Sequence, residues 1–232
     1  MVAPVLSIAV VIGAGGGIGA ALLAGLEAGG AYGQVIGLGR NSTPPLDLLS
    51  EPSIAAAAAH VAGAGELRLV LDATGFLHGA GFSPERGLRA LDPAHMAHSY
   101  AINAIGPALL MKHFCPLLPR QGRAVFATLS ARVGSIGDNR LGGWHSYRAA
   151  KAALNQVLRT ASVEMHRSHP DAILVALHPG TVATPLSAPF SKSGLSVRPA
   201  EEAARDILAV VAGLQAAETG GFFDQAGAAI PW

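Results

Sequence analysis

Short apolar runs, many of them β-branched, alternate along this chain with longer segments rich in alanine and leucine. Runs of the first kind predict buried strands, and segments of the second kind predict helices. We expect strands at 5–12, 34–39, 67–73, 122–129, 172–178 and 221–224, and helices at 17–29, 51–63, 92–118, 146–168 and 200–217. The alternation predicts repeated βαβ units and a doubly wound α/β fold whose parallel sheet has helices on both faces.

The chain contains no composition shift, charged block, long linker or repeat of fixed period. We therefore expect one domain over residues 1–232. The segment 184–199 is rich in proline and small polar residues. It follows the end of a predicted strand, where open α/β sheets bind ligands, and is a candidate substrate lid. Together with 76–90 it is expected to supply the pocket walls.

Half of the residues are hydrophobic and only 13% are charged, so the chain has ample apolar material for a core and is not a disordered protein. The formal net charge is +1, and the basic residues are scattered. This distribution argues against a nucleic-acid partner. The single cysteine, Cys115, cannot form an intramolecular disulfide and is expected to be a buried thiol.

The N-terminus is apolar, but it lacks a basic leading segment and its apolar run ends in glycines. These features favour a buried first strand over a signal peptide or a membrane span. We expect a cytoplasmic protein without a membrane partner. The nine histidines show no metal-ligand spacing, so no metal site is predicted.

A cluster of glycines follows the first predicted strand and opens the first predicted helix. Its members are Gly13, Gly15, Gly16, Gly17 and Gly19. Without side chains, their backbone N–H groups can approach a pyrophosphate at the positive end of the helix. The spacing is looser than Gly-x-Gly-x-x-Gly, and a tight structural turn is the alternative interpretation.

Arg40 follows the second predicted strand, where the adenosine ribose of a dinucleotide lies in such a fold. An arginine there can pair with a 2′-phosphate, whereas an acidic residue would favour a free 2′-hydroxyl. Arg40 therefore favours NADP(H) over NAD(H). A solvated surface arginine is the alternative.

Tyr147 and Lys151 are four residues apart on a predicted helix, so their side chains project from one face. A tyrosine is a poor proton donor or acceptor near neutral pH unless a cation stabilises its phenolate. Lys151 is placed to supply that cation. The same spacing also occurs by chance on exposed helices.

Several motifs occur in one order along the chain. They are the Gly13/Gly17/Gly19 turn, Asp72-Ala73-Thr74-Gly75, Asn103, the Tyr147/Lys151 pair, and Pro179-Gly180-Thr181-Val182-Ala183-Thr184. In this order they resemble the short-chain dehydrogenase/reductase family, from Gly13 to about Phe223. The segment from Ser130 to Asn155 is most similar to the C-factor-type branch, which includes carbonyl reductases and a bacterial developmental signalling protein. The resemblance implies a Rossmann-type fold.

The resemblance also implies roles for individual residues. Tyr147 would be the general acid or base, Lys151 would hold the nicotinamide ribose and lower the pKa of the tyrosine, and Asn103 would fix a water in the proton relay. Asp47 would contact adenine, although a helix N-terminal cap is the alternative. Further cofactor-binding positions implied by the resemblance are Ile18, Ala73, Gly75, Pro179, Gly180, Val182 and Thr184.

One position departs from the family pattern. The family usually has Ser-Ser-x-x-Gly, with the second serine bonding the substrate carbonyl, but this chain has Ser130-Ala131-Arg132-Val133-Gly134. The aligned residue is therefore Ala131. Either Ser130, which we favour, or Ser135 supplies the hydroxyl, or the carbonyl is held more weakly.

These observations together predict an NAD(P)(H)-dependent oxidoreductase that reduces a ketone or aldehyde, with Tyr147 as proton donor and Lys151, Asn103 and Ser130 as further catalytic residues. The alternative is a cofactor-binding signalling protein of the same fold with weak or no turnover, which Ala131 favours. Small residues on the Tyr147 helix permit close helix packing. They are Ala149, Ala150, Ala152 and Ala153. We expect a homodimer or homotetramer, unless this face packs on its own sheet.

Overall fold

A computed structural model describes residues 6–190 and 197–232 of the chain. Six parallel strands form one sheet in the order β2-β1-β3-β4-β5-β6. The strands are β1 (Ser7–Ile12), β2 (Gln34–Leu38), β3 (Glu66–Asp72), β4 (Ala124–Leu129), β5 (Ala172–His178) and β6 (Phe222–Asp224). The predicted parallel, doubly wound sheet is confirmed, with strand ends within two residues of the expected positions.

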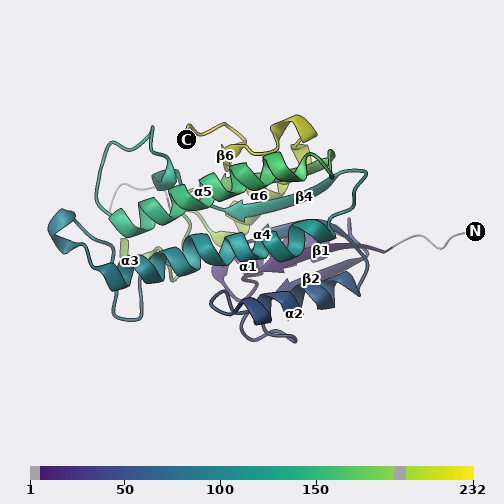
Figure 1. Cartoon of the computed structure of the whole chain (residues 1–232), viewed down its shortest axis with the longest axis horizontal. Coiled ribbons are helices and arrows are strands. Elements are labelled where there is room, and N and C mark those ends of the chain that lie inside the picture. The colour runs from purple at the N-terminus through teal and green to yellow at the C-terminus, as the bar shows by residue number, and fades with distance from the viewer. Residues whose placement is uncertain (1–5, 191–196) are drawn as a thin grey trace, which may run out of the picture.

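Helices cover both faces of this sheet (Figure 1). They are α1 (Gly17–Gly29), α2 (Glu51–Ala62), α3 (Pro93–Tyr100), α4 (Gly106–Phe114), α5 (His145–Met165) and α6 (Ala200–Gly213). Helices α2, α4 and α5 pack on one face, whereas α1 and α6 pack on the other. Because β1, β4 and β5 are buried on both faces, their sequences are nearly continuous apolar runs rather than alternating ones.

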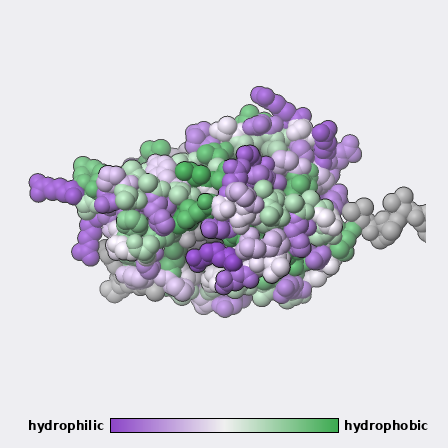
Figure 2. Space-filling model, turned by 60° about the horizontal axis from the view of Figure 1, so that its bottom comes forward, coloured by the Kyte–Doolittle hydropathy of each residue, from purple (hydrophilic) through white to green (hydrophobic). Residues whose placement is uncertain are grey.

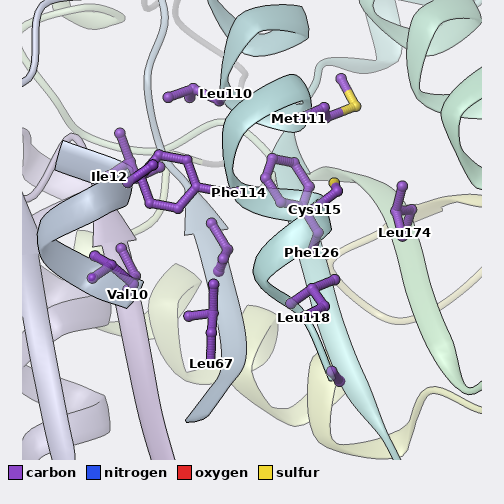
Figure 3. Packing of buried hydrophobic residues seen from close by; sticks show 14 of the residues in the cluster. Val10, Ile12, Leu67, Leu110, Met111, Phe114, Cys115, Leu118, Phe126 and Leu174 are labelled. Atoms are coloured by element: carbon purple, nitrogen blue, oxygen red, sulfur yellow. The ribbon is translucent and has the colours of Figure 1, made fainter. Parts of the chain in front are cut away.

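The larger of the two apolar cores lies between the sheet and α2, α4 and α5. Phe114 and Phe126 are fully buried there (Figure 3). Cys115 belongs to the same core, as expected, and burial raises the pKa of its thiol. On α5, Ala150 and Leu154 are buried within the chain, so for these two positions the sheet of the same chain is the packing partner.

The segment predicted as one helix over 92–118 is instead interrupted. A π-helical turn, Ala101–Ile105, separates α3 from α4, and a 3-10 turn, Cys115–Leu117, ends the segment. Proline explains the first break, because Pro107 has no amide hydrogen for the carbonyl of Asn103, its partner in an α-helix. Pro116 lies in the terminal turn. The segment is nevertheless helical from Pro93 to Leu117, as predicted, and only its π-helical and 3-10 turns were not expected.

The start of α2 decides between two interpretations of Asp47. The N-cap of α2 is Ser50, whose hydroxyl accepts the amide of Ser53 at 3.4 Å. Asp47 instead accepts the amide of Leu49 at 3.0 Å, in a turn that precedes the helix. The cap interpretation of Asp47 was wrong, and its carboxylate lies half-buried before α2.

The order of the strands creates the position of the site. From β1 the chain adds β2 on one side and β3 on the other, so loops leave the carboxyl ends of β1 and β3 in opposite directions. Open α/β sheets bind ligands in the crevice expected at such a point. On the face shown in Figure 2, polar and apolar residues are interspersed. Within residues 6–190 and 197–232, no helix is long and apolar enough to cross a membrane.

Candidate active site

The glycine-rich turn lies at the carboxyl end of β1, against two other motifs. Gly13 has a φ of +83°, and a Cβ atom there would lie 3.1 Å from the backbone of Ala73. A Cβ atom on Gly17 would lie 2.9 Å from Cγ2 of Thr184. The structure therefore brings the three motifs together, and the absence of side chains in the turn permits this close packing.

The first turn of α1 is open to an anion. Its N-cap is Gly16, which offers no capping side chain, and the first turn contains no acidic residue. Gly15 is exposed, and a Cβ atom there would have no neighbour within 4 Å. Backbone amides at the positive end of a helix, with free space before them, suit a pyrophosphate.

Tyr147 and Lys151 lie one helical turn apart near the start of α5. The Lys151 side chain is buried, and its Nζ lies 6.0 Å from the centre of the Tyr147 ring. Nζ donates a hydrogen bond of 2.7 Å to the carbonyl oxygen of Leu129, at the end of β4. This bond directs the ammonium group toward the carboxyl edge of the sheet, beside the half-buried tyrosine.

Burial changes the acidity of both groups. It raises the pKa of Tyr147 to about 12, whereas the resemblance implied a pKa lowered by Lys151, so the phenol keeps its proton at neutral pH. Burial lowers the pKa of Lys151 to about 8, although the charge of Asp72 opposes this shift. Lys151 is therefore largely charged at pH 7 and loses its charge as the pH rises through about 8.

Asn103 and Gly75 lie next to this pair. A Cβ atom on Gly75 would lie 3.6 Å from Oδ1 of Asn103 and 3.9 Å from Nζ of Lys151. Oδ1 of Asn103 accepts the amide of Phe76 at 2.9 Å, and Nδ2 donates to the carbonyl of Phe76 at 2.8 Å and to Ser99 Oγ at 3.2 Å. Both amide hydrogens are thus used, so Asn103 can hold a water only as an acceptor.

Asp72 provides a buried acidic group at the end of β3. Its Oδ1 accepts the backbone amide of Thr74 at 3.0 Å, and its Oδ2 accepts the Thr128 hydroxyl at 2.7 Å. Burial raises the pKa of Asp72, while these hydrogen bonds and the charge of Lys151 act against the shift. Asp72 therefore sets part of the electrostatic environment of Lys151.

The two candidate serines lie in different places. Ser130 is buried at the end of β4, and its hydroxyl donates to Oδ1 of Asn155 at 2.7 Å. Ser135 donates instead to the carbonyl of Pro231, near the C-terminus. Asn155 lies on the same face of α5 as Tyr147 and Lys151. Sequence reasoning missed Asn155, although its spacing of four residues from Lys151 is a signal that was available.

Other expected residues surround this centre. Arg40 is exposed just after β2 and makes no hydrogen bond or ion pair with any residue that the structure describes. After β5, Gly180 has a φ of +79° and Val182 is buried. The amide of Ala183 bonds the carbonyl of Arg198 at 2.8 Å, so the two ends of the candidate lid meet. Residues 191–196 of that lid lie outside the described part of the chain.

Aromatic side chains form a wall beside Tyr147 that the sequence did not suggest. The Trp144 ring lies 6.3 Å from the Tyr147 ring and 5.4 Å from the Phe190 ring, between ring centres. His78 lies 5.3 Å from Phe190, and its Nε2 lies 3.1 Å from the carbonyl oxygen of Pro185. The wall thus joins residues of the two loops expected to line the pocket.

Comparison with known proteins decides the family. The family model for short chain dehydrogenases matches residues 7–194, which include the glycine turn and the Tyr147/Lys151 pair. The chain belongs to the short-chain dehydrogenase family. The expected membership is thereby confirmed, and with it an oxidoreductase of this kind.

This short-chain dehydrogenase is similar to several known proteins. It is 35% identical over 143 residues to C-signal of Myxococcus xanthus, and the matched region covers 61% of this chain and 81% of C-signal. It is 32% identical over 189 residues to 1-hydroxy-2-glutathionyl-2-methyl-3-butene dehydrogenase of a Rhodococcus species, covering 82% and 79%. NADPH-bound carbonyl reductase from chicken fatty liver superposes with a TM-score of 0.83 at 27% identity, covering 98% and 99%. C-signal is a relative of the C-factor type, so the expected resemblance to that branch is confirmed.

Proposed function

We propose that this short-chain dehydrogenase reduces a ketone or aldehyde with NADPH, and that Tyr147 donates the proton. The observation that carries this proposal is the placement of Tyr147 with the buried Lys151 ammonium 6.0 Å from its ring, at the same sheet edge as the open glycine turn. The pair lies on α5, which follows β4, and the turn lies between β1 and α1. The proposed proton donor and the proposed dinucleotide site therefore lie at the same edge of the sheet.

The residues present fit a nicotinamide dinucleotide. Its pyrophosphate would lie on the amides of Gly15 to Ile18, its adenine near Asp47, and its nicotinamide end near Gly75 and Thr184. When bound, the cofactor supplies the hydride. Gly75 has no side chain to fill the space between Asn103 and Lys151, and Thr184 lies against Gly17, so the proposed path of the cofactor follows positions already brought together.

Protonation states favour the reducing direction. At neutral pH the phenol of Tyr147 carries its proton, because burial raises its pKa to about 12. An alkoxide formed from a carbonyl is a much stronger base than a phenolate, so proton transfer from Tyr147 to it is favourable. The Lys151 cation stabilises the phenolate that remains. Each step uses a group that the fold already holds in place.

The proposal is tested by titrating the wild-type protein with NADPH and NADH, followed by fluorescence, and by measuring turnover with simple aldehydes and ketones. NADPH binding with carbonyl-dependent NADPH oxidation supports the proposal. NADPH binding without turnover on any carbonyl would favour the signalling alternative. Binding of neither nucleotide would contradict the dinucleotide site.

Arg40 is proposed to recognise the 2′-phosphate of NADPH. It is exposed after β2 with no described partner, and the carbonyl reductase from chicken fatty liver was solved with NADPH. We expect Arg40→Ala to weaken NADPH binding by roughly 10- to 100-fold, since a charge-assisted contact of about 1.5–3 kcal/mol is lost. NADH binding should change little. Equal losses for the two nucleotides in fluorescence titrations would contradict this role.

Ser130 remains our candidate for the substrate hydroxyl bond. Nδ2 of Asn155 is buried without a hydrogen-bond partner. Rotation of the Asn155 amide by half a turn would make Nδ2 the donor to Ser130 Oγ and release the serine proton toward a substrate. Asn155 would then orient the hydroxyl of Ser130 toward the substrate. This hydroxyl would replace the one that the aligned residue, Ala131, lacks.

We expect Ser130→Ala to lower kcat by about 10²-fold, the typical effect of removing one donor to a developing oxyanion. Ser135→Ala is the matched comparison, because its hydroxyl bonds the carbonyl of Pro231. Its expected effect is a loss of about 1 kcal/mol in the free energy of unfolding, with kcat unchanged. Steady-state kinetics and thermal unfolding measure both. Equal kcat in the two variants would remove Ser130 from the mechanism.

A further inference from the structure

Helix α5, which carries Tyr147, begins without a cap of its own. The three residues before it, Gly142, Gly143 and Trp144, all have positive φ, at +63°, +67° and +53°. The N-cap Trp144 makes no side-chain capping bond, and the first turn contains no acidic residue. The free amides of that turn therefore need acceptors from elsewhere in the chain.

Glu85, from the loop between β3 and α3, supplies these acceptors. Its backbone carbonyl accepts the amide of Trp144 at 2.6 Å. Its carboxylate accepts the amide of Ser146 at 3.2 Å through Oε2 and the Ser146 hydroxyl through Oε1. A Cβ atom on Gly143 would lie 3.4 Å from the Glu85 carbonyl oxygen. The loop is thus packed directly on the start of the helix.

The surroundings of Glu85 stabilise a buried negative charge. The residue is 3% exposed, and Nδ1 of His95 lies 3.2 Å from Oε1. The His95 ring stacks on Phe82 with 5.0 Å between ring centres. Burial raises the pKa of Glu85, but the hydrogen bonds that its carboxylate accepts, chiefly from Ser146, and the charge of His95 together outweigh burial, so the pKa lies below its usual value. The ionised carboxylate also suits the positive end of α5.

We infer that Glu85 is a positioning residue that fixes the first turn of α5, and through it the orientation of Tyr147. Ser146, which Glu85 holds by both its amide and its hydroxyl, directly precedes Tyr147. The same loop is held at its start, because Asn103 binds both backbone groups of Phe76. One segment therefore links the Gly75–Asn103 side of the crevice to the proton donor.

The test compares Glu85→Gln, Glu85→Ala and Ser146→Ala with the wild-type protein. The matched control is Glu218→Gln. Glu218 also caps a helix turn, by accepting the amide of Gln215 at 2.7 Å, but it lies beside β6 and outside the crevice. The measurements are kcat and KM with NADPH and a reducible carbonyl, NADPH binding by fluorescence, and hydrogen exchange of the amides of residue 146 and Arg148.

We expect Glu85→Ala to lower kcat by about 100-fold, since small misplacement of a reacting group has effects of this size. Glu85→Gln keeps one acceptor and should lose only about 10-fold, and Ser146→Ala a similar amount, with KM and NADPH binding within about twofold of wild type. Exchange at position 146 and at Arg148, whose amide bonds the carbonyl of Trp144 at 2.8 Å, should accelerate in these variants and not in Glu218→Gln. Unchanged kcat in folded Glu85→Gln and Ser146→Ala would overturn the inference.

The kinetic measurement rests on the proposed carbonyl reduction, whereas the exchange measurement does not. If the wild-type protein reduces no carbonyl, the proposed function fails and the exchange rates alone decide the role of Glu85. Faster exchange in Glu85→Gln than in Glu218→Gln then supports positioning of the Tyr147 turn. Equal exchange rates in the two variants overturn it.

Discussion

Tyr147→Phe is expected to lower kcat for carbonyl reduction by about 10³-fold, within the range typical of a lost general acid. The substitution removes only the hydroxyl, so the ring contact with Trp144 and the position of Lys151 are retained. NADPH binding should stay within about twofold of wild type, because the variant loses an interaction used mainly in the transition state. Steady-state kinetics and fluorescence titration measure the two quantities separately.

Tyr32→Phe is the control for this experiment. Tyr32 is half-buried just before β2, at the amino end of the strand, whereas Tyr147 lies toward the carboxyl ends. Burial raises the pKa of the Tyr32 phenol as well. Its substitution should leave kcat unchanged. Turnover by Tyr147→Phe at the wild-type rate would exclude Tyr147 as the proton donor, even if the variant bound NADPH normally.

The sheet and the cofactor-side motifs could be predicted from the sequence because their signals are local. A continuous apolar run followed by glycines marks β1 and the turn at Gly13, and the four-residue spacing of Tyr147 and Lys151 places both on one helix face. The parallel orientation of the strands then follows, because the strands alternate with helices along the chain. These inferences needed no knowledge of which distant residues meet.

The residues that sequence reasoning missed depend on contacts between distant segments. Glu85 and Ser146 are 61 positions apart, and nothing in the spacing of either residue indicates the other. Ser130 and Asn155 are 25 positions apart. The π-helical turn at Ala101–Ile105 has a local cause in Pro107. A proline inside a helix disrupts it, but a proline in the first turn of a new helix is tolerated, so Pro107 is compatible with either arrangement. Only the packing of α3 and α4 on the rest of the chain decides between them.

Lys151→Met should lower kcat by about 10³-fold and also weaken NADPH binding. Removal of the ammonium takes away the cation beside Tyr147, so the phenolate formed on proton transfer becomes less stable. Nucleotide affinity should fall as well, because the cationic side chain is proposed to hold the nicotinamide ribose. A loss of kcat without any loss of NADPH binding in fluorescence titrations would contradict that second role.

The pH dependence of the wild-type protein tests the same cation without a substitution. Burial lowers the pKa of Lys151 to about 8, so the charged form predominates below that pH and is lost above it. The kcat/KM for carbonyl reduction, which reports groups of the free enzyme, should therefore fall as the pH rises through about 8. The proton on Tyr147 does not set this limit, because its pKa of about 12 lies far above it.

Asp72→Asn tests whether Lys151 causes the fall of kcat/KM above about pH 8. The negative charge of Asp72 raises the pKa of Lys151 against the effect of burial. Without that charge the ammonium loses its proton more easily, so the alkaline limit of kcat/KM should move to lower pH. The asparagine oxygen can still accept the amide of Thr74, and its NH2 group can donate to the Thr128 hydroxyl, which then acts as the acceptor. Lys151→Arg should abolish the limit near pH 8, because a guanidinium stays charged throughout this range. An unchanged limit in both variants would mean that another group controls the pH dependence.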